Sequence, residues 1–332
     1  MIDFESASWR DLYPFESNFF DIDGFRYHYL DEFDSAVGGG ASLEFAALEA
    51  ATSAAAGPIR PPDSPPTLLF VHGNPTWSFH WRRLILALRG QYRCIAPDHL
   101  GCGGSDLQPR PLRLADHIDN LVRLVESLDL RQVTLVAQDW GGAIGLGAAL
   151  RAVGRFDRIA LFNTGAFPPW FIPWRIRVCR WPVVGRLAVQ GGNAFSLAAL
   201  RMTLSRSARL DPRVAHAYLA PHRDWRHRGA VYQFVQDIPL SAGHPTWQTL
   251  ADIESQLPAL ASLPIQLIWG MRDWCFTPAC LDKFCGIWPA AEIHRLADVG
   301  HWVLEDAPGE AQSILGGWLD ATLPVAHGSM SP

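Results

Sequence analysis

Charged residues are scarce in this chain, and no stretch of it forms a basic tract. Only 18% of the 332 residues are Asp, Glu, Lys or Arg, and the formal net charge is −5. Nucleic-acid-binding proteins ordinarily gather an excess of Lys and Arg on one face or segment, so nucleic-acid binding is not expected here. The hydrophobic content of 48% is instead typical of a globular chain with a large buried core.

Cysteine pairs of the metal-binding type are also absent. The six cysteines include no C-x-x-C pair, and the last three recur every five residues, a spacing that fits neither a zinc site nor an iron–sulfur cluster. We therefore predict reduced thiols, mostly buried, with no bound metal and no cofactor. The six are Cys94, Cys102, Cys179, Cys275, Cys280 and Cys285.

Targeting and membrane-spanning signals are missing as well. The first residues, Met1 to Glu5, show neither the basic start nor the apolar centre of a secretory signal. No uninterrupted apolar run reaches the length that a transmembrane helix needs. We expect a cytoplasmic enzyme that does not contact a membrane.

Apolar runs of strand length alternate with helical patterns over much of the chain. Near the start, an Asp23-Gly24 turn between two strand-like runs predicts a β-hairpin. The alternation that follows predicts an α/β fold, with a mostly parallel sheet covered by helices on both faces. The predicted strands cover residues 67–71, 92–96, 132–137, 158–162, 265–269 and 292–296. The predicted helices cover residues 79–89, 114–128, 141–153 and 308–323.

Two segments interrupt this alternation. Residues 34–66 are rich in glycine, alanine and proline, which predicts a flexible insertion. Residues 164–260 are rich in tryptophan, arginine and proline and have helical but no clear strand patterns, which predicts an inserted helical cap. The core then consists of residues 1–163 and 261–325, followed by a disordered tail at 326–332.

Within the predicted cap, residues 168–181 combine aromatic side chains with several arginines. Such a segment could touch a membrane or an acidic partner. We prefer the interpretation that a cap helix here lines the entrance of a ligand cavity.

Residues 136–142, Val-Ala-Gln-Asp-Trp-Gly-Gly, have the pattern of a nucleophile elbow. In its common form, G-x-S-x-G, a serine sits on a strained turn between a strand and a helix. Asp139 occupies the serine position here. A serine would attack an acyl carbon, whereas a carboxylate that attacks an sp3 carbon forms an alkyl ester. The exchange therefore predicts an enzyme that displaces a leaving group from carbon rather than an esterase.

His301 and Asp273 are the candidate base and acid. His301 follows the last predicted strand, and Asp273 ends the segment Trp-Gly-Met-Arg-Asp after the preceding strand. The resulting order of nucleophile, acid and histidine is the one that α/β-hydrolases use. The alternatives make His301 an ordinary loop histidine and Asp273 a turn-capping residue, with Asp298 as the rival acid.

Asn74 and Trp140 are the candidate donors for the departing anion. Asn74 lies in residues 72–77, just after the first buried strand, and Trp140 directly follows the nucleophile position. An amide NH2 and an indole N–H suit a weakly hydrated anion such as a halide, and the indole can only donate. Backbone amides of residues 72–77 are also placed to form part of an oxyanion hole, and His72 is interpreted as a brace for this loop. The alternative makes both donors packing residues.

Together these residues resemble the haloalkane dehalogenases of the α/β-hydrolase superfamily, over most of the chain outside 34–66 and the extreme termini. In that family the acid follows either the strand before the cap or the later strand. Asn163 occupies the first location, and an amide cannot serve as the acid, so the resemblance assigns that role to Asp273. With Asn74 and Trp140 as the halide pair, the site is similar to the third subfamily. The motifs that carry the resemblance are Asn74-Pro75-Thr76-Trp77, Asp98-His99-Leu100-Gly101-Cys102-Gly103, Asp139-Trp140-Gly141-Gly142 and Gly300-His301.

The resemblance implies a dehalogenase that cleaves carbon–halogen bonds of hydrophobic small molecules through an aspartyl ester, giving alcohol and halide. The third subfamily is also similar to the β-lactone decarboxylases of long-chain olefin biosynthesis, which convert a cis-3,4-dialkyl oxetanone to olefin and CO2. That similarity reaches into the predicted cap at residues 193–195, 220–221 and 234–240. Active-site chemistry alone leaves both activities open.

Two further alternatives have less support. Epoxide hydrolases also use an aspartate nucleophile but need cap tyrosines, and the cap offers only Tyr218 and Tyr232; Asn74 also argues against this class. A binding protein on a hydrolase fold would not need a complete set of nucleophile, acid and base. A homo-oligomer and a complex with pathway enzymes both stay open.

Overall fold

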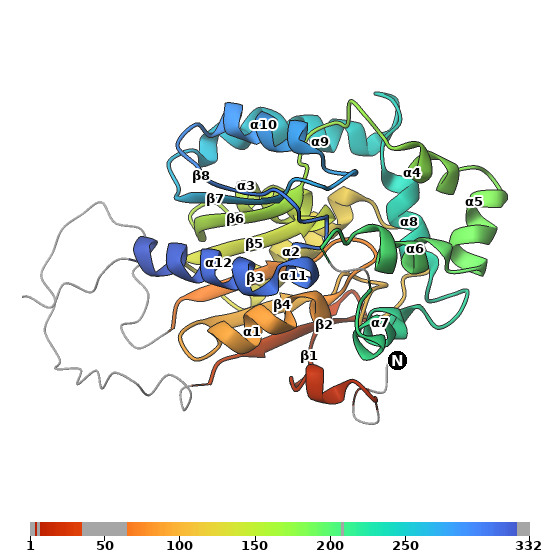
Figure 1. Cartoon of the computed structure of the whole chain (residues 1–332), viewed down its shortest axis with the longest axis horizontal. Helices are drawn as coiled ribbons and strands as arrows, with labels where there is room; N and C mark the ends of the chain where they lie inside the picture. Colours follow the sequence, from red (N-terminus) through yellow and green to blue (C-terminus); the bar gives the residue numbers. More distant parts are fainter. Residues whose placement is uncertain (1–3, 5–6, 35–64, 207–208, 324–332) are drawn as a thin grey trace, which may run out of the picture.

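An eight-stranded sheet runs through the centre of the molecule (Figure 1), which we describe from a computed structural model over residues 4, 7–34, 65–206 and 209–323. The strand order is β1-β2-β4-β3-β5-β6-β7-β8. The pairs β1–β2 and β2–β4 are antiparallel, and every later pair is parallel. The strands are β1 (Asn18–Ile22), β2 (Phe25–Glu32), β3 (Thr67–Val71), β4 (Arg93–Pro97), β5 (Val133–Asp139), β6 (Phe156–Thr164), β7 (Ile265–Gly270) and β8 (Glu292–Leu296).

The predicted mostly parallel sheet and its N-terminal hairpin are confirmed. Each predicted strand is present, with bounds within two residues of those expected. Inner strands are buried on both faces, and successive residues of β3 alternate between two core clusters. Leu69 and Val71 belong to one cluster, whereas Leu68 and Phe70 belong to the other.

Helices cover both faces of the sheet. In Figure 1, α9 and α10 lie along the upper side of the sheet and α1 lies along the lower side. The core helices are α1 (Arg82–Leu88), α2 (Leu114–Ser127), α3 (Trp140–Arg151), α9 (Pro245–Gln256), α10 (Pro278–Ile287), α11 (Val303–Asp306) and α12 (Pro308–Thr322). The helix predicted at 79–89 is divided, because a 3-10 turn, Ser78–Trp81, precedes α1.

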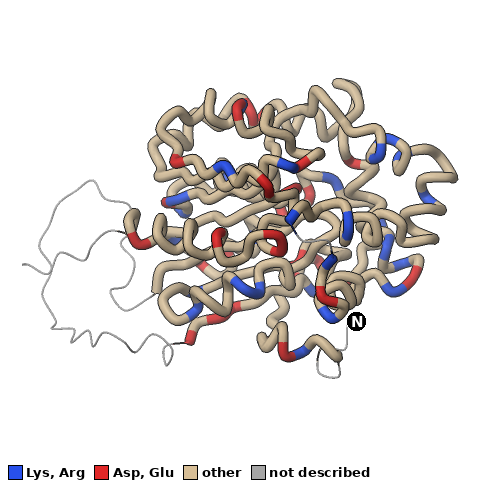
Figure 2. Tube along the Cα trace, viewed as in Figure 1, with Lys and Arg blue, Asp and Glu red and all other residues tan. Residues whose placement is uncertain are grey.

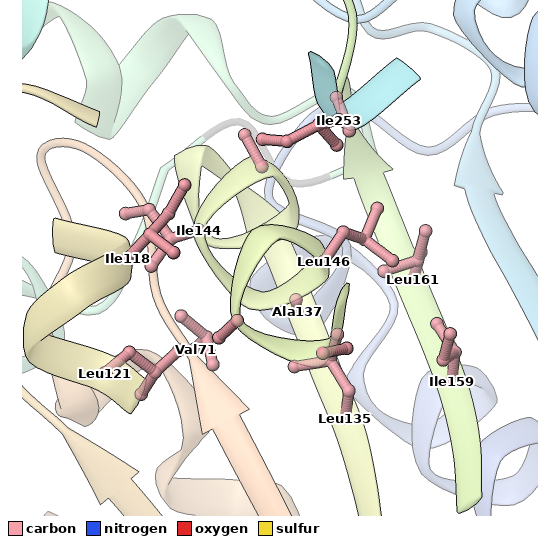
Figure 3. Packing of buried hydrophobic residues seen from close by; sticks show 14 of the residues in the cluster. Val71, Ile118, Leu121, Leu135, Ala137, Ile144, Leu146, Ile159, Leu161 and Ile253 are labelled. Atoms are coloured by element: carbon pink, nitrogen blue, oxygen red, sulfur yellow. The ribbon is translucent and has the colours of Figure 1, made fainter. Parts of the chain in front are cut away.

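Helix α3 packs closely against its neighbours, and this close packing holds the residue at its start in place. Figure 3 shows Ile118 of α2 and Ile253 of α9 beside α3. A Cβ on Gly147 of α3 would lie 2.5 Å from Cδ1 of Ile118 and 3.3 Å from Cδ1 of Ile253. Each fully buried side chain of this size contributes about 1.5–3 kcal/mol to stability. Helix α9, which falls inside the cap range expected from the sequence, therefore packs with the core helices. The expected cap bounds, 164 and 260, stay a prediction.

The segment between β6 and α9 is helical in its described part, as the pattern indicated, and forms the right-hand end of the molecule in Figure 1. The indole N–H of Trp77 donates to the carbonyl of Ala217 at 3.1 Å, which ties this segment to the core. Its helices are α4 (Trp174–Cys179), α5 (Val184–Arg186), α6 (Ala194–Met202), α7 (Pro212–Leu219) and α8 (Gly229–Asp237), with a π-helical turn, η3 (Leu187–Gly191), between α5 and α6.

Two expectations fall on residues outside the described ranges. These are the flexible insertion, apart from its end residues 34, 65 and 66, and the tail at 326–332. Among the helices that the structure describes, none combines the length and the apolar character needed to span a membrane.

Candidate active site

Asp139 sits on a strained turn where β5 ends and α3 begins. Its backbone angles are φ 54° and ψ −131°, a conformation that residues with a Cβ rarely adopt and that persists only where the surroundings enforce it. The glycines that follow allow this turn. A Cβ on Gly141 would lie 2.0 Å from the carbonyl oxygen of Val71, and one on Gly142 would lie 2.0 Å from Oγ1 of Thr164. The predicted elbow geometry is therefore present at Asp139.

The carboxylate of Asp139 is held at the floor of a cavity. Its Oδ1 accepts a hydrogen bond of 2.7 Å from the backbone N–H of Asn74, and its side chain is only 14% exposed. The loop before Asn74 approaches so closely that a Cβ on Gly73 would lie 2.1 Å from Oδ1. A negatively charged oxygen is thus presented at a fixed point, with little water around it.

His301 and Asp273 meet beside this carboxylate. Nδ1 of His301 lies 2.7 Å from Oδ2 of Asp273, and Nε2 lies 3.6 Å from Oδ2 of Asp139. Asp273 is itself oriented, because its Oδ1 accepts backbone hydrogen bonds from Cys275 at 2.7 Å and Phe276 at 3.1 Å. The structure therefore brings together the three side chains that the sequence proposed as nucleophile, base and acid.

The rival acid, Asp298, lies outside this group. Its side chain is 63% exposed and forms an ion pair of 2.6 Å with Arg206. Asn163 has a structural role, since its side chain donates to the carbonyl of Gly270 at 2.9 Å and accepts from the N–H of the same residue at 2.7 Å. It braces β6 against β7 and carries no ionisable group.

Two carboxylates raise the pKa of His301. Burial alone would lower the pKa of this imidazole, but Asp273 and Asp139 outweigh burial and raise it to about 10. His301 is therefore protonated at neutral pH. Removing the charge of Asp139 would lower the pKa of His301 and convert the ring toward a base.

Asn74 and Trp140 both line the cavity next to Asp139. The amide nitrogen of Asn74 donates to the carbonyl of Val231 at 3.3 Å, and an NH2 group retains a second N–H after one such bond. The indole of Trp140 is partly buried and lies 5.6 Å from the ring of Phe234, centroid to centroid. Both predicted donors therefore lie at the nucleophile, and Asn74 also positions it through its backbone N–H.

His72 braces the loop, as expected. Its Nδ1 lies 2.8 Å from the carbonyl oxygen of Gly73 and its Nε2 accepts from the backbone N–H of His99 at 3.0 Å. Burial lowers the pKa of His72, so the ring is neutral.

Gln138 was not singled out from the sequence, yet it links the site to a buried polar network. Its side-chain amide donates to the carbonyl of His301, and its Oε1 contacts Nε2 of His80. Nδ1 of His80 lies 2.8 Å from the hydroxyl of Tyr218, which donates to Glu305 at 2.7 Å. The signal in the sequence was a single amide inside an otherwise apolar strand, adjacent to the nucleophile.

The cavity in front of Asp139 is mainly apolar. Its empty volume is about 950 Å³, a figure that includes the open mouth. Aromatic and aliphatic side chains from the cap close it over the carboxylate, as in most small-molecule sites. The cap residues in the lining are Phe167, Pro169, Trp170, Phe171, Ile172, Pro173, Ile176, Phe195, Ile238 and Pro239, and Leu250 of the core helix α9 joins them.

Comparison with known proteins identifies the family to which this arrangement belongs. The model of the alpha/beta hydrolase fold family matches residues 66–308. The chain belongs to the α/β-hydrolase family. The α/β-hydrolase fold that the sequence resemblance implied is therefore confirmed.

The relatives of this α/β-hydrolase fall into two groups. It is 40% identical over 252 residues to a cis-3-alkyl-4-alkyloxetan-2-one decarboxylase of Shewanella oneidensis, covering 73% of this chain and 78% of the relative. It is 31% identical over 307 residues to haloalkane dehalogenase 2 of Mycobacterium tuberculosis, covering 90% and 92%. Among solved structures, haloalkane dehalogenase DbeA from Bradyrhizobium elkani matches with a TM-score of 0.76 and 25% identity, covering 92% of this chain and 98% of that one.

Proposed function

We propose that this α/β-hydrolase is an enzyme that forms a covalent ester on Asp139 and releases halide from haloalkanes. The observation that carries the proposal is the Asp139 carboxylate at the elbow, facing an apolar cavity and lying 3.6 Å from His301. The pairing of His301 with Asp273 at 2.7 Å supports their roles as base and orienting acid.

In the first step, Oδ of Asp139 attacks the carbon that bears the halogen, and the carbon–halogen bond breaks. The products are an alkyl ester on Asp139 and a halide ion. Asn74 and Trp140 both line the cavity and would hold the halide through their N–H groups. These donors are neutral, so they stabilise the departing anion without neutralising the attacking carboxylate.

In the second step, water attacks the carbonyl carbon of the ester. Ester formation has removed the charge of Asp139, so the pKa of His301 falls from about 10. The imidazolium then releases its proton to solvent, and the neutral ring can accept a proton from the attacking water. Asp273, 2.7 Å from Nδ1 of His301, stabilises the imidazolium that forms. The alcohol leaves, and the Asp139 carboxylate is restored.

A second candidate is the fragmentation of cis-3-alkyl-4-alkyloxetan-2-ones, which the sequence comparison favours. Identity with two decarboxylases is 40% and 38%, whereas identity with the dehalogenase of Mycobacterium tuberculosis is 31%. With Asp139 as nucleophile, attack on the alkyl carbon of the ring C–O bond opens the lactone and gives an aspartyl ester that carries a free carboxylate. Breakage of the bond between this carboxylate and the adjacent carbon then releases CO2, its electron pair forms the olefin, and the ester C–O bond breaks to restore Asp139. This reaction consumes no water, so only ring opening at Asp139 would be shared with dehalogenation.

Epoxide hydrolysis has weaker support, because its cap tyrosine would have to reach the substrate. Tyr218 is fully buried in the network with His80 and Glu305 and is not part of the cavity lining.

The dehalogenase proposal includes a hydrophobic small molecule as substrate and halide as a released product. A cytoplasmic location and the oligomeric state stay predictions.

The deciding experiment compares two substrates under one set of conditions. The protein is incubated with a short bromoalkane and with a cis-3,4-dialkyl oxetan-2-one, and bromide, CO2 and olefin are measured. In water labelled with heavy oxygen, the first turnover of dehalogenation places the label on the Asp139 carboxylate and later turnovers carry it into the alcohol, whereas olefin formation incorporates none. Asp139→Ala must abolish each product. Absence of all products with the unsubstituted protein overturns both candidates.

A further inference from the structure

Exposed apolar side chains gather on the cap. Of the fourteen large apolar side chains that are exposed in the described part of the chain, ten lie within residues 164–260. Single exposed apolar residues are normal on protein surfaces, but a concentration of them marks an interaction site. The ten are Trp170, Phe171, Trp174, Trp181, Val183, Val184, Leu187, Leu197, Trp225 and Leu240.

Six of these residues form one surface, which we call the cap face: Trp174, Trp181, Val183, Val184, Leu187 and Trp225. Helix α4 contacts α5, and α5 continues into η3. Trp225, from a distant segment, joins them, because the guanidinium of Arg186 on α5 lies 5.4 Å from its ring centroid. A Cβ on Gly191 of η3 would also lie 3.5 Å from that ring. The cap face therefore continues across three elements.

Positive charge predominates around the cap face, although Asp224, next to Trp225, is acidic and lies 2.7 Å from Nδ1 of His227. Residues 164–210 contain seven arginines and no Asp or Glu, although the whole chain has a formal net charge of −5. Arg175, Arg177 and Arg186 are exposed on α4 and α5, and Figure 2 shows blue arginine segments at this outer end of the molecule. Arg206, in the same stretch, is already paired with Asp298 and Glu310. The cap face thus complements a negatively charged surface.

The mouth of the active-site cavity opens beside the cap face. Trp170 and Phe171 line the cavity and are nevertheless 53% and 58% exposed. They lead directly into α4, so an apolar path connects the surface with Asp139. The sequence indicated that residues 168–181 line the entrance of the cavity. Trp174 and Trp181 are not part of the cavity wall and are 69% and 56% exposed. A role in lining the entrance therefore does not explain these two side chains.

We propose that the cap face docks on an anionic lipid bilayer and that the enzyme takes its apolar substrate from the membrane. Tryptophan and arginine side chains are suited to the lipid–water interface, where rings enter the headgroup region and cations meet anionic lipids. An acidic protein on the same face would cover the entrance, whereas a bilayer presents an apolar molecule at it. The loading role rests on the proposed function; docking itself does not.

Vesicle flotation tests the docking. The full chain is mixed with vesicles of phosphatidylcholine alone or with added phosphatidylglycerol, at low and high salt. Flotation is expected only with phosphatidylglycerol, and it should weaken at high salt. Arg177→Gln and Arg186→Gln should each weaken binding about five-fold, and the double variant Trp174→Ser/Trp181→Ser should abolish it. Matched controls far from the cap face are Arg151→Gln and Val153→Ser, which should float like the unsubstituted protein.

Flotation that ignores lipid charge, or that the control variants reduce equally, overturns the proposal. No flotation on either vesicle also overturns it and leaves an acidic protein as the occupant to seek. Turnover of a short, water-soluble bromoalkane without vesicles separates this result from the proposed function. Cap-face variants should keep that turnover, whereas the Asp139→Ala variant should lose it and still float.

Discussion

Nε2 of His301 lies 3.6 Å from Oδ2 of Asp139. On the other side of the imidazole ring, Nδ1 lies 2.7 Å from Oδ2 of Asp273. One imidazole thus stands between two carboxylates in a buried site. Asp273 and Asp139 together raise the pKa of His301, and a reaction that consumes the charge of Asp139 lowers that pKa at the moment a base is needed.

Asp139→Asn should lower the pKa of His301 from about 10 toward the ordinary histidine range. The variant removes one of the two charges that raise the pKa and leaves burial, which lowers it. Histidine-selective NMR titration measures the shift, with His301→Phe used to assign the signal among the twelve histidines. An unchanged pKa in Asp139→Asn would show that Asp273 alone controls the ring.

The same linkage predicts how stability depends on pH. A group whose pKa rises on folding stabilises the folded state in full at pH values below its unfolded pKa, which is about 6.5 for histidine. This stabilisation is lost as the pH rises through the folded pKa, which is about 10 for His301. The free energy of unfolding should therefore decline by a few kcal/mol across that window, roughly 1.4 kcal/mol per unit of pKa shift. Denaturant unfolding at several pH values measures it, and the decline should be shallower in Asp139→Asn.

His301→Phe should trap the ester intermediate. Asp139 can still attack a haloalkane in this variant, but no base activates water for the second step. One equivalent of halide should be released, and the peptide containing Asp139 should gain the mass of the alkyl group in mass spectrometry. His294→Phe, a substitution at a histidine on β8 that pairs with Glu292, is the control and should turn over normally. An unmodified Asp139 peptide after incubation with a good substrate contradicts the mechanism.

Trp140→Phe should slow halide release while preserving an aromatic ring against Phe234. Loss of one donor to a developing anion typically costs on the order of 100-fold in kcat. Rapid-quench measurement of bromide checks this, and the effect should be larger for bromide release than for olefin formation from an oxetanone. Trp174→Phe is the matched control outside the cavity wall. Equal rates in the variant and the unsubstituted enzyme would remove Trp140 from the anion site.

Local sequence patterns were sufficient for the sheet and for the three central site residues. Asp139 ends a mostly apolar strand and Asp273 follows another, whereas His301 follows the mixed strand β8, Glu-Ile-His-Arg-Leu. Strand ends in a parallel sheet meet at one edge. Helix α10 was not predicted, because its apolar stripe is short, with Leu281 and Phe284 three residues apart. Its core contacts come from Leu281 and Phe284 alone among fully buried side chains.

Long-range polar pairs could not be predicted from one sequence. Arg82 and Glu305 form a buried ion pair although 223 residues separate them, and neither stands in a motif. Similarly, the hydrogen bond from the side chain of Gln138 to the carbonyl of His301 depends on how the loop before α11 packs against the sheet. Such pairs are decided by tertiary packing, which leaves no periodic trace in the chain.

Gln138→Leu should reduce kcat about 100-fold with little effect on KM. The substitution removes the side-chain donor to the carbonyl of His301 and the contact with His80, and a displacement of about 1 Å in a reacting group can cost that much. Gln266→Leu is the control, since Gln266 is also a fully buried amide on a parallel strand. Wild-type kcat in Gln138→Leu, with the pH profile unchanged, would show that the network only stabilises the fold.

Gly73→Ala should abolish ester formation without unfolding the protein. The new Cβ would lie 2.1 Å from Oδ1 and 2.4 Å from Cβ of Asp139, so rotation of the carboxylate is not enough. The whole Asp139 side chain and the loop at Gly73 must move apart, which breaks the hydrogen bond from the N–H of Asn74. No positive φ is required at Gly73, so the conflict is with the nucleophile and not with the backbone. Gly286→Ala, where nothing lies within 4 Å of the added Cβ, controls for the substitution itself and should raise stability by roughly 0.5–1 kcal/mol within α10. A trapped ester in the double variant Gly73→Ala/His301→Phe would contradict the placement of Asp139.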